Sequence, residues 1–234
     1  MIISIHQPDY IPYPGYFYKI AQSDVFVFLD DAQYSNDNMH QWNRIKTPQG
    51  ECRLKIPVKH EFGDNINEVQ TRDNLKWREK HLKTIEMNYL RAPYFPEAFP
   101  AIREIIASDH ADLAELNIEL NTHICRCFGI GKKFIRSSDM DISTRKEERV
   151  IDICVMLGGT KYISGNGARA YQTEEHFTSR GVELCYTDYH PFEYEQLWGD
   201  FIPNLSILDY IFNCGYDWDR VERSIREVNG MTNV

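Results

Sequence analysis

A histidine and a glutamine follow the first apolar stretch of the chain, directly ahead of a segment rich in proline. The segment IHQPDYIPYPGYFYKI, residues 5–20, holds three prolines and four tyrosines. Each proline fixes a backbone torsion, so this loop can hold polar groups in place, as catalytic and binding sites require. The alternative is a structural loop whose tyrosines pack on the prolines. We predict that His6 is catalytic and that Gln7 binds substrate.

Two adjacent aspartates, Asp30 and Asp31, end the apolar run DVFVFL. Neighbouring carboxylates at the end of a strand can serve as general bases or ligate a hard cation such as Mg²⁺. Paired aspartates also cap turns. We predict a catalytic role for Asp30 and no metal site.

The stretch YISGNGARAY places Gly165 and Gly167 between a predicted strand and a predicted helix. The N-terminus of a helix attracts phosphate, so the turn from Gly165 to Tyr171 is predicted to hold the phosphates of a nucleotide sugar. Its Gly-x-Gly-x-x-Ala form, followed by Asp188 about 20 residues later, also matches a dinucleotide fingerprint in outline. Because that fingerprint normally opens a Rossmann half and this one comes late, nicotinamide binding is the weaker interpretation. We predict that Gly165, Gly167, Tyr171 and Asp188 bind substrate.

The polar stretch HQWNRIKTPQG contains Asn43 and Arg44 ahead of a predicted strand. An arginine can grip a phosphate or carboxylate through two parallel hydrogen bonds, although a solvated loop charge is the alternative. We predict that Arg44 is catalytic and that Asn43 binds substrate. His81 lies four residues after Trp77 on a predicted helix, a spacing that favours packing of the two rings. His81 is therefore only a secondary candidate for the site.

Strands that alternate with helices must position these residues. Strands are predicted at 1–6, 24–31, 51–60, 132–140, 160–164 and 182–189. Helices are predicted at 14–23 and 73–90, over much of 97–128, and at 143–159, 168–181 and 201–215. This alternation predicts an α/β fold: a mostly parallel, Rossmann-like sheet flanked by helices, with a small β insertion and a helical middle section. We predict a single domain over residues 1–234, with a frayed tail at 228–234.

Composition narrows the function. The formal net charge of −9 gives no general attraction to nucleic acid, and no basic stretch offsets it. No apolar run approaches the roughly 20 residues of a membrane-spanning helix. The six cysteines form no Cys-x-x-Cys pair and no secretory signal precedes them, which predicts reduced thiols in the cytoplasm.

Several of these segments together resemble the WbqC-like family, whose members are encoded in bacterial O-antigen and other surface-polysaccharide gene clusters. The resemblance is carried by HQPDYIPYPGYFYKIAQSDVFVFLDDAQYS, NRIKTPQG, LKIPVK, YISGNGARAY and FIPNLSILDYIFNCG. It implies a cytoplasmic bacterial protein that acts on a sugar nucleotide or polysaccharide precursor. It adds Tyr10, Lys19 and Gln33 to the expected substrate-binding residues. The residues that match the family's motifs are His6, Gln7, Pro8, Tyr10, Gly15, Lys19, Asp30, Gln33, Asn43, Arg44, Gly165, Tyr171, Ser206 and Asp209.

The reading that combines these features is an acyl- or aminoacyltransferase acting on the amine of a nucleotide-linked amino sugar. His6 would be the base, Asp30 would orient it or share its role, and Arg44 would stabilise developing negative charge. The acyl donor would be nucleotide-activated or bound to a carrier such as an acyl carrier protein, and no cofactor is assigned. The alternatives are a nucleotidyltransferase-like enzyme and a noncatalytic sugar-nucleotide-binding protein of a polysaccharide assembly complex.

Overall fold

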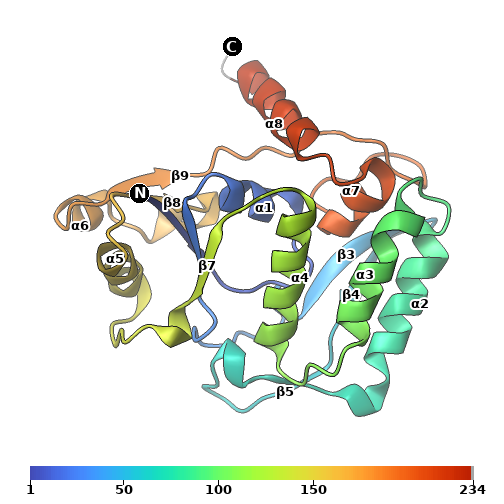
Figure 1. Ribbon diagram of the computed structural model, residues 1–234, viewed down its shortest axis with the longest axis horizontal. Helices are drawn as coiled ribbons and strands as arrows, with labels where there is room; N and C mark the ends of the chain where they lie inside the picture. Colours follow the sequence, from blue (N-terminus) through green and yellow to red (C-terminus); the bar gives the residue numbers. More distant parts are fainter. Residues whose placement is uncertain (233–234) are drawn as a thin grey trace.

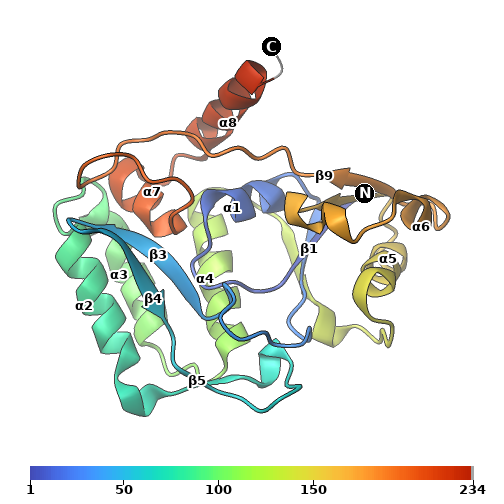
Figure 2. The ribbon, with the colours of Figure 1, turned by 180° about the vertical axis from the view of Figure 1, so that it is seen from behind.

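A five-stranded parallel sheet lies at the centre of the computed structural model, which describes residues 1–232 (Figures 1 and 2). The strand order is β7-β2-β1-β8-β9, and every neighbouring pair is parallel. The strands are β1 (Ile2–His6), β2 (Val25–Phe28), β7 (Lys133–Arg136), β8 (Lys161–Ser164) and β9 (Glu183–Tyr186). The predicted α/β fold with a parallel sheet flanked by helices is confirmed.

Helices and two small antiparallel pairs surround this sheet. The helices are α1 (Pro14–Ala21), α2 (Trp77–Tyr89), α3 (Phe95–Ala107), α4 (Leu113–Cys127), α5 (Lys146–Met156), α6 (Glu174–Thr178), α7 (Ile207–Cys214) and α8 (Trp218–Thr232). The 3₁₀ turns are η1 (Ile66–Glu68), η2 (Asp73–Leu75), η3 (Ser137–Asp139) and η4 (Asn166–Ala170). The small pairs are β3 (Trp42–Thr47) with β4 (Gly50–Lys55), and β5 (Val58–Lys59) with β6 (Gln70–Thr71).

Both faces of the sheet are buried, and neighbouring strand residues face opposite cores. Phe26 and Phe28 of β2 belong to the larger hydrophobic cluster, which includes residues of α1, α4 and α7. Val25 and Val27 belong to a second cluster, formed with residues of α5 and α6. Burial on both faces explains the continuous apolar run of this strand, as is usual for parallel sheets.

The strand order creates a switch point between β1 and β8. From β1 the chain moves outward to β2 and β7 on one side, and it then crosses to β8 and β9 on the other. The helical connections at such a point diverge, which leaves a crevice beyond the carboxyl ends of the two central strands. His6 ends β1 and Ser164 ends β8, so the two segments HQP and GNG both leave the sheet at this crevice.

Three helical predictions differ from the structure. The helix predicted over 97–128 is two helices, α3 and α4, because the Asp112 side chain caps a new N-terminus at the backbone N–H groups of Ala114 and Glu115. The helix predicted from residue 168 is the η4 turn followed by the short α6. The helix predicted from residue 201 begins after Ser206, whose hydroxyl oxygen caps it.

The helix α8 is absent from the sequence predictions. It extends away from the rest of the molecule (Figure 1), and its Val221 and Ile225 side chains are buried in the larger cluster. The predicted tail at 228–234 begins inside this helix, which continues to Thr232; residues 233–234 lie outside the described part of the chain. Within residues 1–232, no helix is both long enough and apolar enough to cross a bilayer.

A close approach between Gly159 and β1 gives a stability prediction. A Cβ at position 159 would lie 2.5 Å from Cγ1 of Ile3 and 3.1 Å from the carbonyl oxygen of Cys154, both of which are buried. Gly159→Ala is therefore expected to lower the free energy of unfolding by about 1–3 kcal/mol, measured by urea denaturation. Gly131→Ala is the matched control, because a Cβ there meets nothing within 4 Å. Equal effects of the two substitutions would contradict the packing described here.

Candidate functional site

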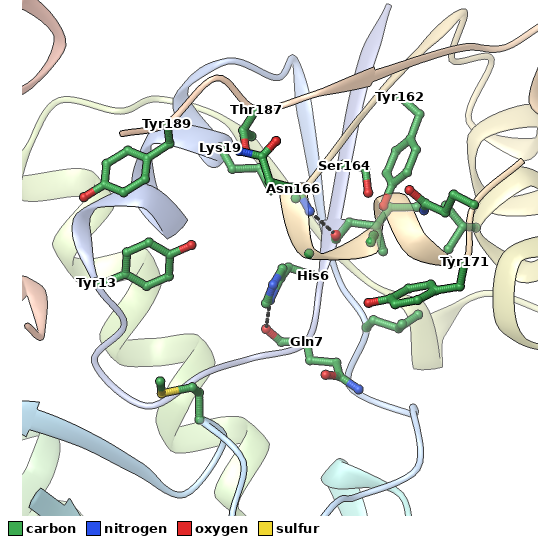
Figure 3. Close-up of a pocket in the computed structure, with 18 of the residues that line it drawn as sticks. His6, Gln7, Tyr13, Lys19, Tyr162, Ser164, Asn166, Tyr171, Thr187 and Tyr189 are labelled. Carbon is green, nitrogen blue, oxygen red and sulfur yellow. Dashed lines mark hydrogen bonds between the residues drawn. The ribbon is translucent and has the colours of Figure 1, made fainter. Parts of the chain in front are cut away.

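A cavity of about 1050 Å³ occupies the crevice at the switch point. Its volume is at the upper end of the range typical of small-molecule and cofactor sites, about 300–1,000 Å³. The cavity brings together predicted residues from three separate stretches of the chain, and Figure 3 shows His6, Gln7, Lys19 and Tyr171 around it. The predicted residues that line it are His6, Gln7, Lys19, Arg44, Gly165, Gly167 and Tyr171.

His6 is held in one tautomer with a free nitrogen. Its Nδ1–H donates to the carbonyl oxygen of Gln7 at 3.1 Å, because a carbonyl oxygen can only accept. The ring also packs edge-on against Tyr16, with 4.9 Å between ring centroids. Nε2 makes no hydrogen bond to a described residue. Burial lowers the pKa of His6 below its usual 6.5, and nearby Lys19 lowers it further, so the ring is neutral at pH 7 and Nε2 can accept a proton.

Lys19 of α1 places a buried amine beside this histidine. Its Nζ donates to the carbonyl oxygen of Ile5 at 2.7 Å, and the residue is only 4% exposed. No carboxylate of the described residues lies within ion-pairing distance of Nζ. Burial lowers the pKa of Lys19 to about 7, against an opposing effect of the Asp9 carboxylate. The amine therefore retains unused donors that an anionic ligand group can satisfy.

Three cationic side chains, Lys19, Arg44 and Lys146, line the cavity, although the chain as a whole is acidic. Arg44 donates to both carboxylate oxygens of Glu51 and to the carbonyl oxygen of Asn204. Lys146 begins α5 at another wall. Among the described residues, Glu147 is the only carboxylate in the lining, and Thr173 N–H and His176 already donate to it. The cavity is thus suited to an anionic ligand.

Tyr13 and Tyr189, which are not among the predicted site residues, form an aromatic wall of the cavity. Tyr13 and Tyr189 meet edge to face, with 5.6 Å between their centroids (Figure 3). Both stand against Gly15, where a Cβ would lie 2.4 Å from the Tyr13 ring and 2.7 Å from the Tyr189 ring. Tyr171 is 72% exposed at the cavity. Aromatic faces of this kind pack against the apolar face of a sugar or a base.

Asp30 does not line the cavity. It is 1% exposed and accepts hydrogen bonds from the Ser137 hydroxyl and from the Ser138 hydroxyl and backbone N–H. The aspartate therefore fixes η3 at the end of β7, on the side of β2 away from β1. The structure places its neighbour Leu29 in the cavity lining instead. This geometry does not support a partnership between Asp30 and His6.

Removing the Asp30 carboxylate is expected to affect stability and to leave ligand binding intact. Asp30→Ala deprives buried donors of their acceptor, which costs about 1–3 kcal/mol of unfolding free energy. Ser138→Ala removes one donor to the same carboxylate, the Ser138 hydroxyl, and should destabilise in the same direction by a smaller amount. Thermal melts and ligand titrations of both variants provide the measurement. An Asp30→Ala protein of wild-type stability that binds no ligand would contradict this structural role.

Tyr10 and Asn43 do not line the cavity. Their buried contacts hold the proline-rich segment, residues 5–20, in place. Tyr10 is fully buried, and its hydroxyl lies 3.1 Å from Nδ1 of His81. The Asn43 amide donates to the carbonyl oxygens of Tyr10 and Ile11. Ile11 adopts a φ of +38°, which is unfavourable for a β-branched residue, so the Asn43 contact stabilises a strained backbone.

The remaining candidates also lie outside the lining. Gln33 is exposed and forms an isolated β-bridge with Asn65. The Asp188 carboxylate accepts from the Asn229 amide, whereas its neighbours Thr187 and Tyr189 reach the cavity. Asp209 is buried and accepts from the Tyr89 and Tyr194 hydroxyls. Among the described residues, no group of three or more His, Cys, Asp or Glu side chains could hold a metal ion.

Several lining residues lie next to predicted ones in the sequence. Ser164 and Asn166 flank Gly165, and Gln172 follows Tyr171. Their positions beside the GNG turn were the feature of the sequence that could have identified them as residues of the site. Tyr13 lies within the proline-rich segment that the sequence already indicates, whereas Tyr162 reaches the lining from within β8.

Comparison with known proteins identifies the family of the chain. The model of the WbqC-like protein family matches residues 7–220, so the match begins one residue after His6. The chain is also 36% identical over 217 residues to the uncharacterized protein Rv1507c of Mycobacterium tuberculosis, covering 91% of this chain and 94% of that protein. No solved structure matches the chain. The protein belongs to the WbqC-like family.

Proposed function

We propose that this protein transfers an acyl or aminoacyl group to the amine of a nucleotide-linked amino sugar. One observation carries the proposal: a histidine with a free, neutral Nε2 lies in a large cavity at the switch point of the sheet, and Lys19, Arg44 and Lys146 line the same cavity. The base suits an amine nucleophile, and the charge suits the phosphates of a nucleotide.

The expected chemistry uses His6 as a general base. The sugar amine attacks the acyl carbon of the donor and forms a C–N bond while it passes a proton to Nε2 of His6. The bond from the acyl carbon to the leaving group then breaks, and the leaving group takes the electron pair and the proton from His6. The Gln7 amide, which makes no hydrogen bond to a described residue, can donate to the developing oxyanion together with Arg44.

The phosphates of the ligand would lie between the GNG turn and the cationic side chains. Gly165 and Gly167 line the cavity, and a Cβ at either position meets nothing within 4 Å, so ligand atoms can come close to this backbone. Lys19 and Arg44 would supply opposing charge. A role in a bacterial surface-polysaccharide pathway, such as O-antigen synthesis, forms part of the proposal through the family resemblance.

Two matched ligands test the substrate class. UDP-glucosamine carries a free amine, and UDP-glucose carries a hydroxyl at the same carbon. Incubation with an acyl thioester or an aminoacyl adenylate, across UDP, dTDP and GDP sugars, should yield an N-acylated product by mass spectrometry only from amino sugars. If no nucleotide-linked amino sugar in the panel is acylated and none stabilises the protein thermally, the proposal fails.

Nucleotidyl transfer is the second candidate, because the glycine-containing GNGARA turn lines the cavity at the switch point, where ligands of parallel sheets commonly bind. Incubation with ATP, Mg²⁺ and a sugar phosphate distinguishes the two. Release of pyrophosphate with formation of a nucleotide sugar would favour this candidate over acyl transfer.

A further inference from the structure

A buried carboxylate lies beneath His6 on the side away from the free nitrogen. Asp9 is 5% exposed, and its Oδ2 is 3.8 Å from Nδ1 of His6. Its other oxygen, Oδ1, accepts a hydrogen bond of 2.9 Å from Nδ1 of His40, which is fully buried. A single carboxylate thus faces two imidazole rings.

The arrangement around Asp9 is rigid. The Asn121 amide of α4 donates to the carbonyl oxygen of Asp9, and the Asn117 amide, one turn earlier, donates to the carbonyl oxygens of Pro8 and His40. Nε2 of His40 makes no hydrogen bond to a described residue. The hydrogen bond that the ring makes to a described residue is therefore the one from Nδ1 to Asp9. Four buried hydrogen bonds therefore hold one carboxylate at a fixed distance from the proposed base.

We infer that Asp9, itself fixed by His40, is a positioning residue that stabilises the positively charged ring of His6 when Nε2 takes a proton. The inference rests on the proposed function for its catalytic meaning, because a base that gains positive charge benefits from a fixed negative charge nearby. Asp9 takes no proton in this step. The Nδ1–H of His6 remains on the Gln7 carbonyl oxygen throughout.

The charges around His6 act in opposite directions. Burial, Lys19 of α1 and His40 lower the pKa of His6, whereas the Asp9 carboxylate and the Gln7 carbonyl raise it. Asp9 also raises the pKa of Lys19. Removal of the Asp9 charge is therefore expected to shift the titrations of both His6 and Lys19 to lower pH.

Ring-nitrogen NMR of the full chain tests the inference without any substrate. In Asp9→Asn, which keeps an oxygen acceptor for His40, the titration midpoint of His6 should move to lower pH. Asp141→Asn, which removes an exposed carboxylate outside the cavity lining, is the charge-matched control and should leave the midpoint unchanged. In the acyl-transfer assay, kcat of Asp9→Asn should fall about tenfold or more. KM should rise as well, because Lys19, whose pKa falls in the same variant, carries less positive charge at neutral pH. The acid limb of its pH profile should follow the His6 midpoint.

A folded Asp9→Asn protein with an unchanged His6 midpoint would overturn the inference. If that variant does not fold, the tautomer of His6 in the wild-type protein tests the inference instead. Above the midpoint, Nδ1 must carry the proton and Nε2 must not, and the opposite tautomer would overturn the inference. A shifted midpoint in a protein that acylates no sugar would leave the coupling intact and reject the proposed function alone.

Discussion

Replacing His6 by glutamine is expected to lower the rate of acyl transfer by about 10²- to 10⁴-fold, the usual contribution of a general base. The substitution removes the free Nε2 and retains a polar side chain of similar length. Binding should persist, because the positive charges of Lys19 and Arg44 remain. The measurement is kcat and KM from product formation, together with the thermal shift caused by the nucleotide sugar.

His60→Gln is the matched control for this substitution, because His60 is a partly exposed ring outside the cavity. The pH dependence gives a second readout. Since His6 acts as a base, activity should be lost as pH falls through its pKa, which lies below 6.5, and this limb should disappear in His6→Gln. A His6→Gln protein with the turnover of His60→Gln would remove His6 from the mechanism.

Acidification is expected to destabilise the fold through His81. Its Nε2–H donates to the carbonyl oxygen of Lys55, and Nδ1 accepts from the Tyr10 hydroxyl, which requires a neutral ring. Burial lowers the pKa of His81 from 6.5 to about 4. The unfolded chain thus binds this proton more readily, so the stability from this group is complete above pH 6.5 and is lost progressively as pH falls toward 4. The loss corresponds to about 3 kcal/mol.

Denaturant titrations of wild type and His81→Gln at pH 7 and pH 4 measure this contribution. The difference in unfolding free energy between the two proteins should shrink by about 3 kcal/mol from pH 7 to pH 4, because only the wild type carries the titrating ring. The titration of carboxylates elsewhere changes the unfolding free energy of both proteins equally, so it cancels in the difference between them. A difference that does not change with pH would show that His81 is not held neutral by the fold.

The sequence predicts the five central strands because short segments rich in apolar residues alternate with helical patterns along the chain, and the continuous apolar run of β2 is the clearest of them. His6, Gly165 and Gly167 meet as expected, since parallel neighbours end at the same edge of a sheet. The same argument misplaced Asp30. Side chains alternate in direction along extended backbone, so Leu29 faces the cavity while Asp30 points toward η3. The end of a predicted strand identifies the edge of the sheet at which a residue lies. A shift of one residue along the strand end changes whether its side chain points into the cavity or away from it.

Other features depend on contacts between distant segments. The aromatic wall requires Tyr189 to pack on Gly15, and the support of the loop requires Asn117 and Asn121 of α4. Nothing local marks these partners. The signal for α8 was present, because Trp218, Val221 and Ile225 recur at helical spacing, but the polar residues between them obscured it.

The central claim is that the cavity between the ends of β1 and β8 binds a nucleotide-linked amino sugar. A crystal structure of the protein soaked with UDP-glucosamine tests it most directly. We predict density for the diphosphate against the Gly165–Gly167 backbone and Lys19, with the amine within hydrogen-bonding distance of Nε2 of His6. Ligand density elsewhere on the molecule, with this cavity filled only by water, would contradict the claim.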